Sequence, residues 1–239
     1  MNRAQVMIIV LSAAQIAGIG CLAAGSMAAG VTVFAISHAA FLYGTLKPSS
    51  QLFGHIQRTH SETLISIDDG PDPRTTPQLL EALERHRIKA AFFLVGQRAA
   101  KYPELVRAIH DAGHTIGNHT FSHPAGRFWC IDPWSARREI ARCDAAIHAI
   151  TGEVPTLFRS PVGHSNPFVH LTAAAAGKTV MAWSARGFDG VSTPKEKVVA
   201  QIHASLTPGA IVVMHEAYDP QQRGYSPAEI LQAIAPDSE

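Results

Sequence analysis

Residues 63–73, Thr-Leu-Ile-Ser-Ile-Asp-Asp-Gly-Pro-Asp-Pro, contain a short apolar strand that runs directly into an acidic turn. Thr63–Ile67 has the composition of a buried strand, and the Gly, Pro and Asp residues that follow cannot continue it. Asp68 and Asp69 therefore stand next to each other where the strand ends. Two adjacent carboxylates repel each other, and a bound cation or protonation of one of them relieves the repulsion. Taken alone, the pair is better explained as an ordinary acidic turn.

Strand-like and helix-like segments alternate from this point onward. Further strands are predicted at 90–95, 114–118, 156–159, 179–183 and 210–215. Helices are predicted between and after them at 76–86, 98–112, 133–151, 167–176, 194–206 and 227–234. Such alternation indicates parallel strands joined by crossover helices, as a barrel or a doubly wound sheet. In both folds ligands bind at the carboxyl ends of the strands.

Two histidines follow the predicted strand at 114–118, in the sequence His119-Thr-Phe-Ser-His123. Their spacing of four residues allows both imidazoles to bind one metal ion, although such a pair is common by chance. With one carboxylate from another strand end they form a set of two histidines and one acid. This set suits Zn²⁺ or a similar divalent ion and leaves a coordination position open. The other aspartate is then available as a general base.

Four ordered motifs resemble those of the polysaccharide deacetylases, the NodB-homology enzymes of carbohydrate esterase family 4. They are Ser66-Ile-Asp-Asp-Gly-Pro, His119-Thr-Phe-Ser-His, Arg159-Ser-Pro-Val-Gly and Val213-Met-His215. The resemblance extends from about Thr63 to Ala235. It implies a distorted (β/α) barrel of the polysaccharide deacetylase type, here preceded by N-terminal membrane helices. It also implies hydrolytic removal of an N- or O-acyl group from a sugar.

The resemblance implies roles for the first two motifs and for the arginine of the third. Asp68 matches the family's general base, and Arg159 matches the arginine that holds this aspartate. Asp69, His119 and His123 match the ligands of one divalent metal ion, with Zn²⁺ favoured. An alternative for Arg159 is a purely structural ion pair.

The later motifs match the groups that stabilise and protonate the reacting acyl group. His215 matches the general acid, and Asp189 matches the aspartate that orients and charges it; the alternative for His215 is a structural histidine at a strand end. The backbone N–H of Val162, with Pro161 and Gly163 beside it, matches the oxyanion and substrate-binding site.

The sequence also departs from the family pattern. Arg186 stands where the family usually has the first aspartate of an Asp-x-x-Asp-Trp motif, and Gly190 stands at its tryptophan. Val162 replaces the usual tyrosine of the third motif. These changes leave the chemistry possible and put the substrate in doubt. His164 and Phe188 are expected either to rebuild part of the wall or to be a loop residue and a core residue.

Composition restricts the class of protein. Of the 239 residues 16% are charged, against about 25% in an average soluble domain. Residues 1–60 hold only three charged side chains, Arg3, Lys47 and Arg58. The formal net charge of +1 excludes a strongly basic nucleic-acid binder and an acidic disordered chain. Three irregularly spaced cysteines fit neither a disulfide framework nor a cysteine zinc site.

The N-terminal region favours membrane insertion. We predict a hydrophobic region at 1–45 with one or two transmembrane helices, a linker at 46–61 and a catalytic domain at 62–239. The apolar runs at 6–24 and 28–43 favour two spans. The alternatives are a single anchor or uncleaved signal, a cleaved signal peptide, and a buried soluble hairpin. With Arg3 inside, one span exports the domain and two return it to the cytoplasm, so its side is left open.

Three functions are therefore weighed. The leading one is a membrane-anchored, metal-dependent hydrolase that removes an N-acetyl or other acyl group from an amino sugar in a glycan or glycolipid. The second is a deformylase or deacetylase of a lipid-linked sugar precursor at the bilayer surface. The third is a catalytically silent, carbohydrate-binding relative. The complete set of matched acids, histidines and arginine favours an enzyme. The expected partners are an acetylated glycan or lipid-linked sugar and a membrane, without nucleic acid.

Overall fold

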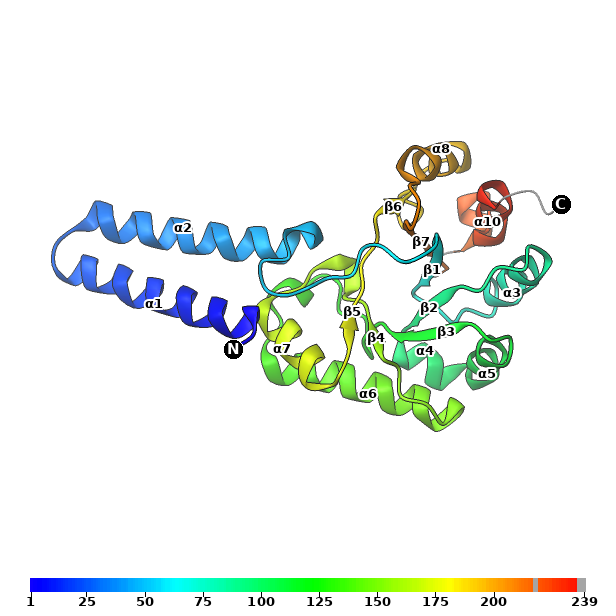
Figure 1. Ribbon diagram of the computed structural model, residues 1–239, viewed down its shortest axis with the longest axis horizontal. Helices are drawn as coiled ribbons and strands as arrows, with labels where there is room; N and C mark the ends of the chain where they lie inside the picture. The colour runs from blue at the N-terminus through cyan, green and yellow to red at the C-terminus, as the bar shows by residue number, and fades with distance from the viewer. Residues whose placement is uncertain (217–218, 236–239) are drawn as a thin grey trace.

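The computed structural model describes residues 1–216 and 219–235. These residues form a helical hairpin and a larger body (Figure 1). A hairpin of two long helices projects from one side of a larger body, in which helices surround a curved sheet. The predicted domain division stays a prediction. Its last part, 62–239, includes residues 217–218 and 236–239, which lie outside the described residues.

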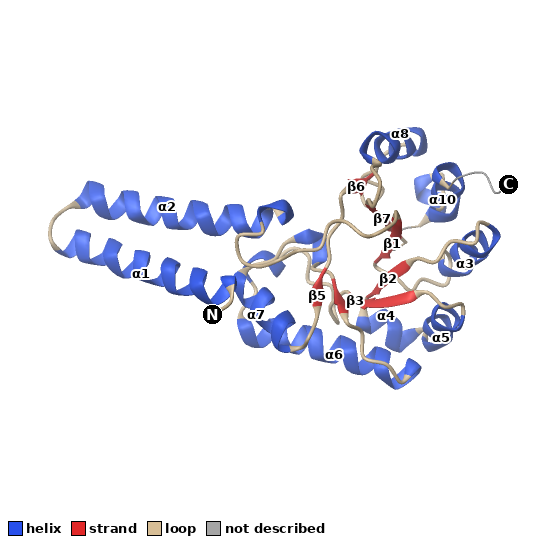
Figure 2. Cartoon of the chain, in the orientation of Figure 1, coloured by secondary structure: helices blue, strands red, loops and turns tan. Residues whose placement is uncertain are grey.

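Within the described residues the sheet contains seven parallel strands in the order β5-β4-β3-β2-β1-β7-β6. The strands are β1 (Leu64–Asp68), β2 (Ala91–Leu94), β3 (Thr115–Asn118), β4 (Leu157–Phe158), β5 (Thr179–Val180), β6 (Ala185–Arg186) and β7 (Ile211–His215). They curl into a half-barrel with helices outside (Figure 2), which confirms the predicted distorted barrel rather than a doubly wound sheet.

The helices of this body follow the predicted alternation. They are α3 (Thr76–Arg85), α4 (Gly96–Lys101), α5 (Pro103–Asp111), α6 (Pro133–Thr151), α7 (Pro167–Ala175), α8 (Lys195–Ser205), α9 (Pro220–Arg223) and α10 (Pro227–Ile234). Apolar faces of these helices pack on the outer face of the sheet. Leu79 and Leu83 of α3 and Ile109 of α5, for example, are completely buried in this main core.

One helix differs from its prediction. The helix expected at 98–112 is two helices, α4 and α5, which meet at Tyr102 and Pro103. Proline has no backbone N–H to donate and its ring excludes the preceding turn, so the chain restarts with Pro103 at the first position of α5. Strand β6, which the sequence did not indicate, has only two residues and pairs with β7.

The strand register aligns the ends at which ligands are expected. Asp68 at the end of β1 lies opposite His215 at the end of β7 and opposite Phe93 of β2. Leu94 lies opposite Asn118, which in turn lies opposite Phe158. The residues that follow β3 and β4 therefore emerge at the same edge of the half-barrel as Asp68 and His215.

The hairpin consists of α1 (Arg3–Ala23) and α2 (Met27–Leu46), whose mean hydropathies are 2.2 and 1.5. By length and composition each helix could cross a membrane. The helices pack through small residues, since a side chain at Gly30 would collide with Leu22. The Gln15 amide also donates a hydrogen bond of 2.6 Å to the Ser37 hydroxyl.

The segment predicted as a linker, residues 46–61, lies against the catalytic body. A short 3-10 turn, η1 (Pro48–Ser50), follows α2. Phe53 and Ile56 are buried, and isolated bridges join Gln57 to Met181 and Thr59 to Ala210.

Candidate active site

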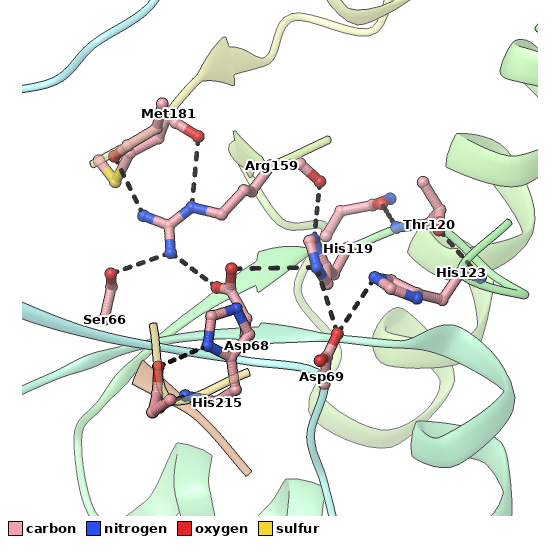
Figure 3. Close-up of polar contacts among 12 residues, drawn as sticks. Ser66, Asp68, Asp69, His119, Thr120, His123, Arg159, Met181 and His215 are labelled. Carbon is pink, nitrogen blue, oxygen red and sulfur yellow. Dashed lines mark hydrogen bonds and ion pairs between the residues drawn. The ribbon is translucent and has the colours of Figure 1, made fainter. Parts of the chain in front are cut away.

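Asp68 ends β1 with its side chain buried against an arginine from the other side of the half-barrel (Figure 3). The Arg159 Nη1 donates a hydrogen bond of 2.6 Å to Asp68 Oδ1 and one of 2.9 Å to the Ser66 hydroxyl. The other guanidinium nitrogens donate to the carbonyls of Met181 and Ala182. Because Arg159 is fully buried and held at several points, it fixes the direction of the Asp68 carboxylate.

Asp69 lies against the two predicted histidines. The His123 Nε2 is 3.1 Å and the His119 Nε2 is 3.5 Å from Asp69 Oδ1 (Figure 3). The candidate ligand atoms of all three residues lie within 4.8 Å of one another. The structure thus brings the three predicted ligands together from two separate turns.

The hydrogen bonds of this group fit a metal ion. His119 Nδ1 lies 2.8 Å from the Arg159 carbonyl, which can only accept, so Nδ1 carries the proton and Nε2 presents its lone pair to Asp69. Asp69 Oδ1 is buried without a hydrogen-bond partner among the described residues. Burial by itself raises the pKa of Asp69, but the close imidazoles of His119 and His123 favour the ionised carboxylate and lower the pKa below its usual value. Inward lone pairs facing a carboxylate are the donor set of a divalent cation.

The loop that carries the histidines has unusual backbone geometry. Thr120 and His123 have φ of 68° and 50°, and Asp69 opposite has φ of 72°, all in the left-handed region. Such conformations persist only when the surroundings impose them. Here the Thr120 hydroxyl accepts from the His123 N–H at 3.1 Å (Figure 3), and Glu139 accepts from two N–H groups of the same loop.

His215 at the end of β7 is paired with Asp189. Its Nδ1 lies 2.9 Å from Asp189 Oδ1, and its backbone N–H donates to Asp189 Oδ2 at 2.6 Å. Burial lowers the pKa of the imidazole, but the charge and hydrogen bond of Asp189 outweigh burial and raise the pKa to about 9. His215 is therefore protonated at neutral pH and can supply a proton.

These groups face one cavity of about 320 Å³. Asp68, Asp69, His119, His123 and His215 all line it.

Val162 lines the same cavity. It has φ of 50°, and no described residue accepts a hydrogen bond from its backbone N–H. Pro161 and Gly163 flank it in the 3-10 turn η3 (Pro161–Gly163), but both are buried and neither is among the residues that line the cavity.

The cavity thus holds a candidate metal cluster, a carboxylate fixed by arginine, a protonated histidine and a free backbone donor. Comparison with known proteins identifies the family. Residues 56–181 match the family model described as polysaccharide deacetylase. The chain belongs to the polysaccharide deacetylase family. It is a hydrolase that acts on carbon–nitrogen bonds other than peptide bonds.

Two relatives are similar to the chain in sequence. A chitooligosaccharide deacetylase of Bradyrhizobium is 33% identical over 70% of this chain and 76% of its own length. A peptidoglycan-N-acetylglucosamine deacetylase of Bacillus cereus is 30% identical over 65% of this chain, which spans only 56% of that protein.

Solved structures agree on the fold. A family 4 carbohydrate esterase from Streptomyces lividans, in complex with acetate, has a TM-score of 0.63 and 31% identity over 74% of this chain and 89% of its own. A peptidoglycan N-acetylglucosamine deacetylase has a TM-score of 0.68 and 28% identity over 74% of this chain and 81% of its own.

The positions that depart from the polysaccharide deacetylase pattern lie along the cavity wall. Arg186 stacks on Phe188, with its guanidinium carbon 4.0 Å from the ring centre, and both line the cavity. Phe188 is 42% exposed, so it is a wall residue and not a core residue. Gly190 lies behind His215, where a Cβ would be 3.3 Å from Nδ1. His164 lines a neighbouring hollow instead.

The sequence did not indicate a role for Glu216, which packs against the acidic turn after β1. It is completely buried, and its carboxyl accepts hydrogen bonds from Thr75 and Thr76. Its backbone N–H donates to the Asp68 carbonyl at 3.1 Å. Burial raises its pKa to about 8, so it is largely protonated at neutral pH. A Cβ at Gly70 would overlap the Glu216 carboxyl, so only glycine allows this approach. The one sequence signal was its place directly after His215.

Proposed function

We propose that this protein is a metal-dependent hydrolase that removes an acetyl or other acyl group from the nitrogen of an amino sugar at a membrane surface. The observation that carries the proposal is the Asp69–His119–His123 cluster, which shares one cavity with Asp68 and His215. The named activities of the relatives, on chitooligosaccharide and on N-acetylglucosamine of peptidoglycan, support an N-acetylated sugar as substrate.

Asp69, His119 and His123 would hold the metal, and two imidazoles with one carboxylate favour zinc. A bound ion would supply Lewis-acid chemistry: it would polarise the acyl carbonyl and lower the pKa of water. Asp68 accepts the proton of the attacking water, because Arg159 holds its carboxylate toward the cavity. The Val162 N–H donates to the oxygen that becomes negative, and His215 gives its proton to the departing amine.

The hairpin supports a place at the membrane with the catalytic body beside the bilayer. The N-terminus lies at the end of the hairpin that faces the body (Figure 1), where Arg3 donates to the Gln51 carbonyl. If both helices span the bilayer, the N-terminus and the body therefore lie on the same side. Arg3, Lys47 and Arg58 then favour the cytoplasmic side. A C-terminal reporter is expected to be active only in the cytoplasm, and activity only outside would contradict two spans with the N-terminus in the cytoplasm.

The function is tested with the full-length protein in detergent or vesicles. Oligosaccharides of N-acetylglucosamine and lipid-linked N-acetylglucosamine are the substrates. We expect the release of acetate with an equal amount of new amine from at least one of them. No release from any of them would contradict the proposal.

The pH dependence of this reaction probes His215. The raised pKa keeps its proton in place until the pH rises through about 9, so the rate is expected to fall there. In Asp189→Asn the charge that raises the pKa is lost, and the alkaline fall is expected to move to lower pH with weaker turnover. Asp111→Asn, an exposed acid outside the cavity, is the matched control. An unchanged alkaline limb in Asp189→Asn would remove Asp189 from the mechanism.

A further inference from the structure

A second hollow, of about 380 Å³, adjoins the active-site cavity. We call it the basic groove and define it by Lys47, Arg58, His164 and Arg186, which line it. Arg186 lines both hollows, as do Val162 and Trp183. A molecule whose acylated end occupies the cavity can therefore extend into the groove.

The positive charge of the groove is unbalanced. Among the described residues no Asp or Glu lines it, and Lys47, Arg58 and Arg186 form no ion pair. The ammonium of Lys47 lies over the Tyr43 ring, and Arg58 Nε donates to the Trp183 carbonyl. Three cations around one hollow without a carboxylate favour an anionic ligand, and guanidinium groups match the oxygens of a phosphate.

A neutral donor or acceptor is also unused beside the groove. His164 Nδ1 is buried and has no hydrogen-bond partner among residues 1–216 and 219–235. Burial lowers the pKa of His164, so the imidazole is neutral near pH 7 and the charge of the groove comes from its three cations.

The groove begins where the apolar hairpin ends. Leu46, the last residue of α2, lines it, and Lys47 follows directly. The Ser165 N–H donates to the Thr45 carbonyl at 3.1 Å, which ties the loop after Val162 to the end of α2. If α2 spans a bilayer, the groove therefore lies at the depth of lipid phosphate groups.

We propose that the basic groove binds the phosphate or diphosphate that links the amino sugar of the substrate to a lipid. This inference rests on the proposed function and names its substrate class: a lipid-phosphate-linked N-acylated amino sugar. The sugar occupies the cavity, the phosphate meets Arg186, Arg58 and Lys47, and the lipid chain enters the bilayer beside α2. Continuity with the cavity favours a phosphate of the substrate over the headgroup of a separate anionic lipid.

The test compares two probes with the same lipid chain, N-acetylglucosamine joined to it through a diphosphate and N-acetylglucosamine joined to it by a neutral glycosidic bond. Both are presented to the full-length protein in neutral phosphatidylcholine vesicles. We measure the binding affinity and the kcat/KM of acetate release. The diphosphate probe is expected to bind at least about tenfold more tightly, as charge-assisted hydrogen bonds to the cations imply.

The double variant Lys47→Gln/Arg58→Gln is expected to lose this preference. Its matched control is Lys101→Gln/Arg107→Gln, which removes the same charge outside the groove. Lys101 also lies over a neighbouring tyrosine ring, Tyr102, at 5.0 Å. The control is expected to keep the preference of the wild type.

The outcomes separate the two proposals. If the wild type binds and hydrolyses both probes equally well, the inference that the groove binds phosphate is overturned and the proposed function is not affected. Preferential binding of the diphosphate probe without acetate release would support the groove and contradict the function. A further measurement adds an anionic lipid to the vesicles. If this lipid stimulates hydrolysis of both probes equally in the wild type, and does not stimulate the Lys47→Gln/Arg58→Gln variant, the groove binds a lipid headgroup and the inference is overturned.

Discussion

Replacement of Asp68 by asparagine is expected to lower turnover by about 10²- to 10⁴-fold, the usual contribution of a general base. The amide has nearly the same shape but cannot accept a proton from water. The metal is expected to remain bound, because Asp69 and not Asp68 lies within ligand distance of both histidines. Metal content and kcat are measured on the same preparation of the full-length protein.

Folding must be checked in this variant, since Asp68 is half of a buried ion pair. Loss of one partner of such a pair is costly when the other charge is left alone. Arg159 keeps its bonds to Ser66 and to two carbonyls, so the variant is expected to fold with a lowered unfolding temperature. If the folded variant loses its metal, the roles of Asp68 and Asp69 have been assigned the wrong way round.

The second large effect is expected from removal of the metal ligands. Asp69→Ala and His123→Ala should each lose the divalent ion and, with it, acyl release. Each takes one of three donors from the cluster, and the remaining two do not complete the set that a zinc site needs. Metal analysis and the acetate assay measure the two losses separately.

Chelation of the wild-type protein should give the same result, and addition of zinc should restore activity to the wild type but not to the variants. His148→Ala, an exposed histidine of α6, is the matched control and should retain both metal and activity. Full turnover by the metal-free wild type would contradict the metal-dependent mechanism.

Much of the fold could be predicted from local patterns. Six of the seven described strands were predicted from the alternation of strand-like and helix-like segments, most clearly β1, β2 and β7, which are mainly apolar because they are buried. The two elements that were not predicted correctly also depend on local features. Strand β6 has two residues and gives no period to read, and the break before Pro103 required proline to be weighed above the surrounding apolar pattern.

The candidate site could be predicted in part. The two histidines and two aspartates stood out only in combination, because each pair alone has an ordinary explanation, and the resemblance to the polysaccharide deacetylase motifs supplied their roles. Glu216 and the basic groove did not stand out. Glu216 looks like an ordinary acid at the end of a strand, and only its burial against Thr75 and Thr76 marks it as a support of the acidic turn.

The sequence by itself determined the order of strands and helices, the apolar hairpin and the residues capable of chemistry, since these depend on neighbours along the chain. Spacing along the chain does not show which aspartate meets which partner, which the resemblance implied and for which the tertiary structure gives the physical reason. The register of β1 and β7 sets Asp68 opposite His215, while the left-handed backbone at Asp69 directs it to the histidines. The tertiary structure also brings Lys47, Arg58 and Arg186 together in one groove. Contacts between such distant segments cannot be predicted from the local sequence pattern.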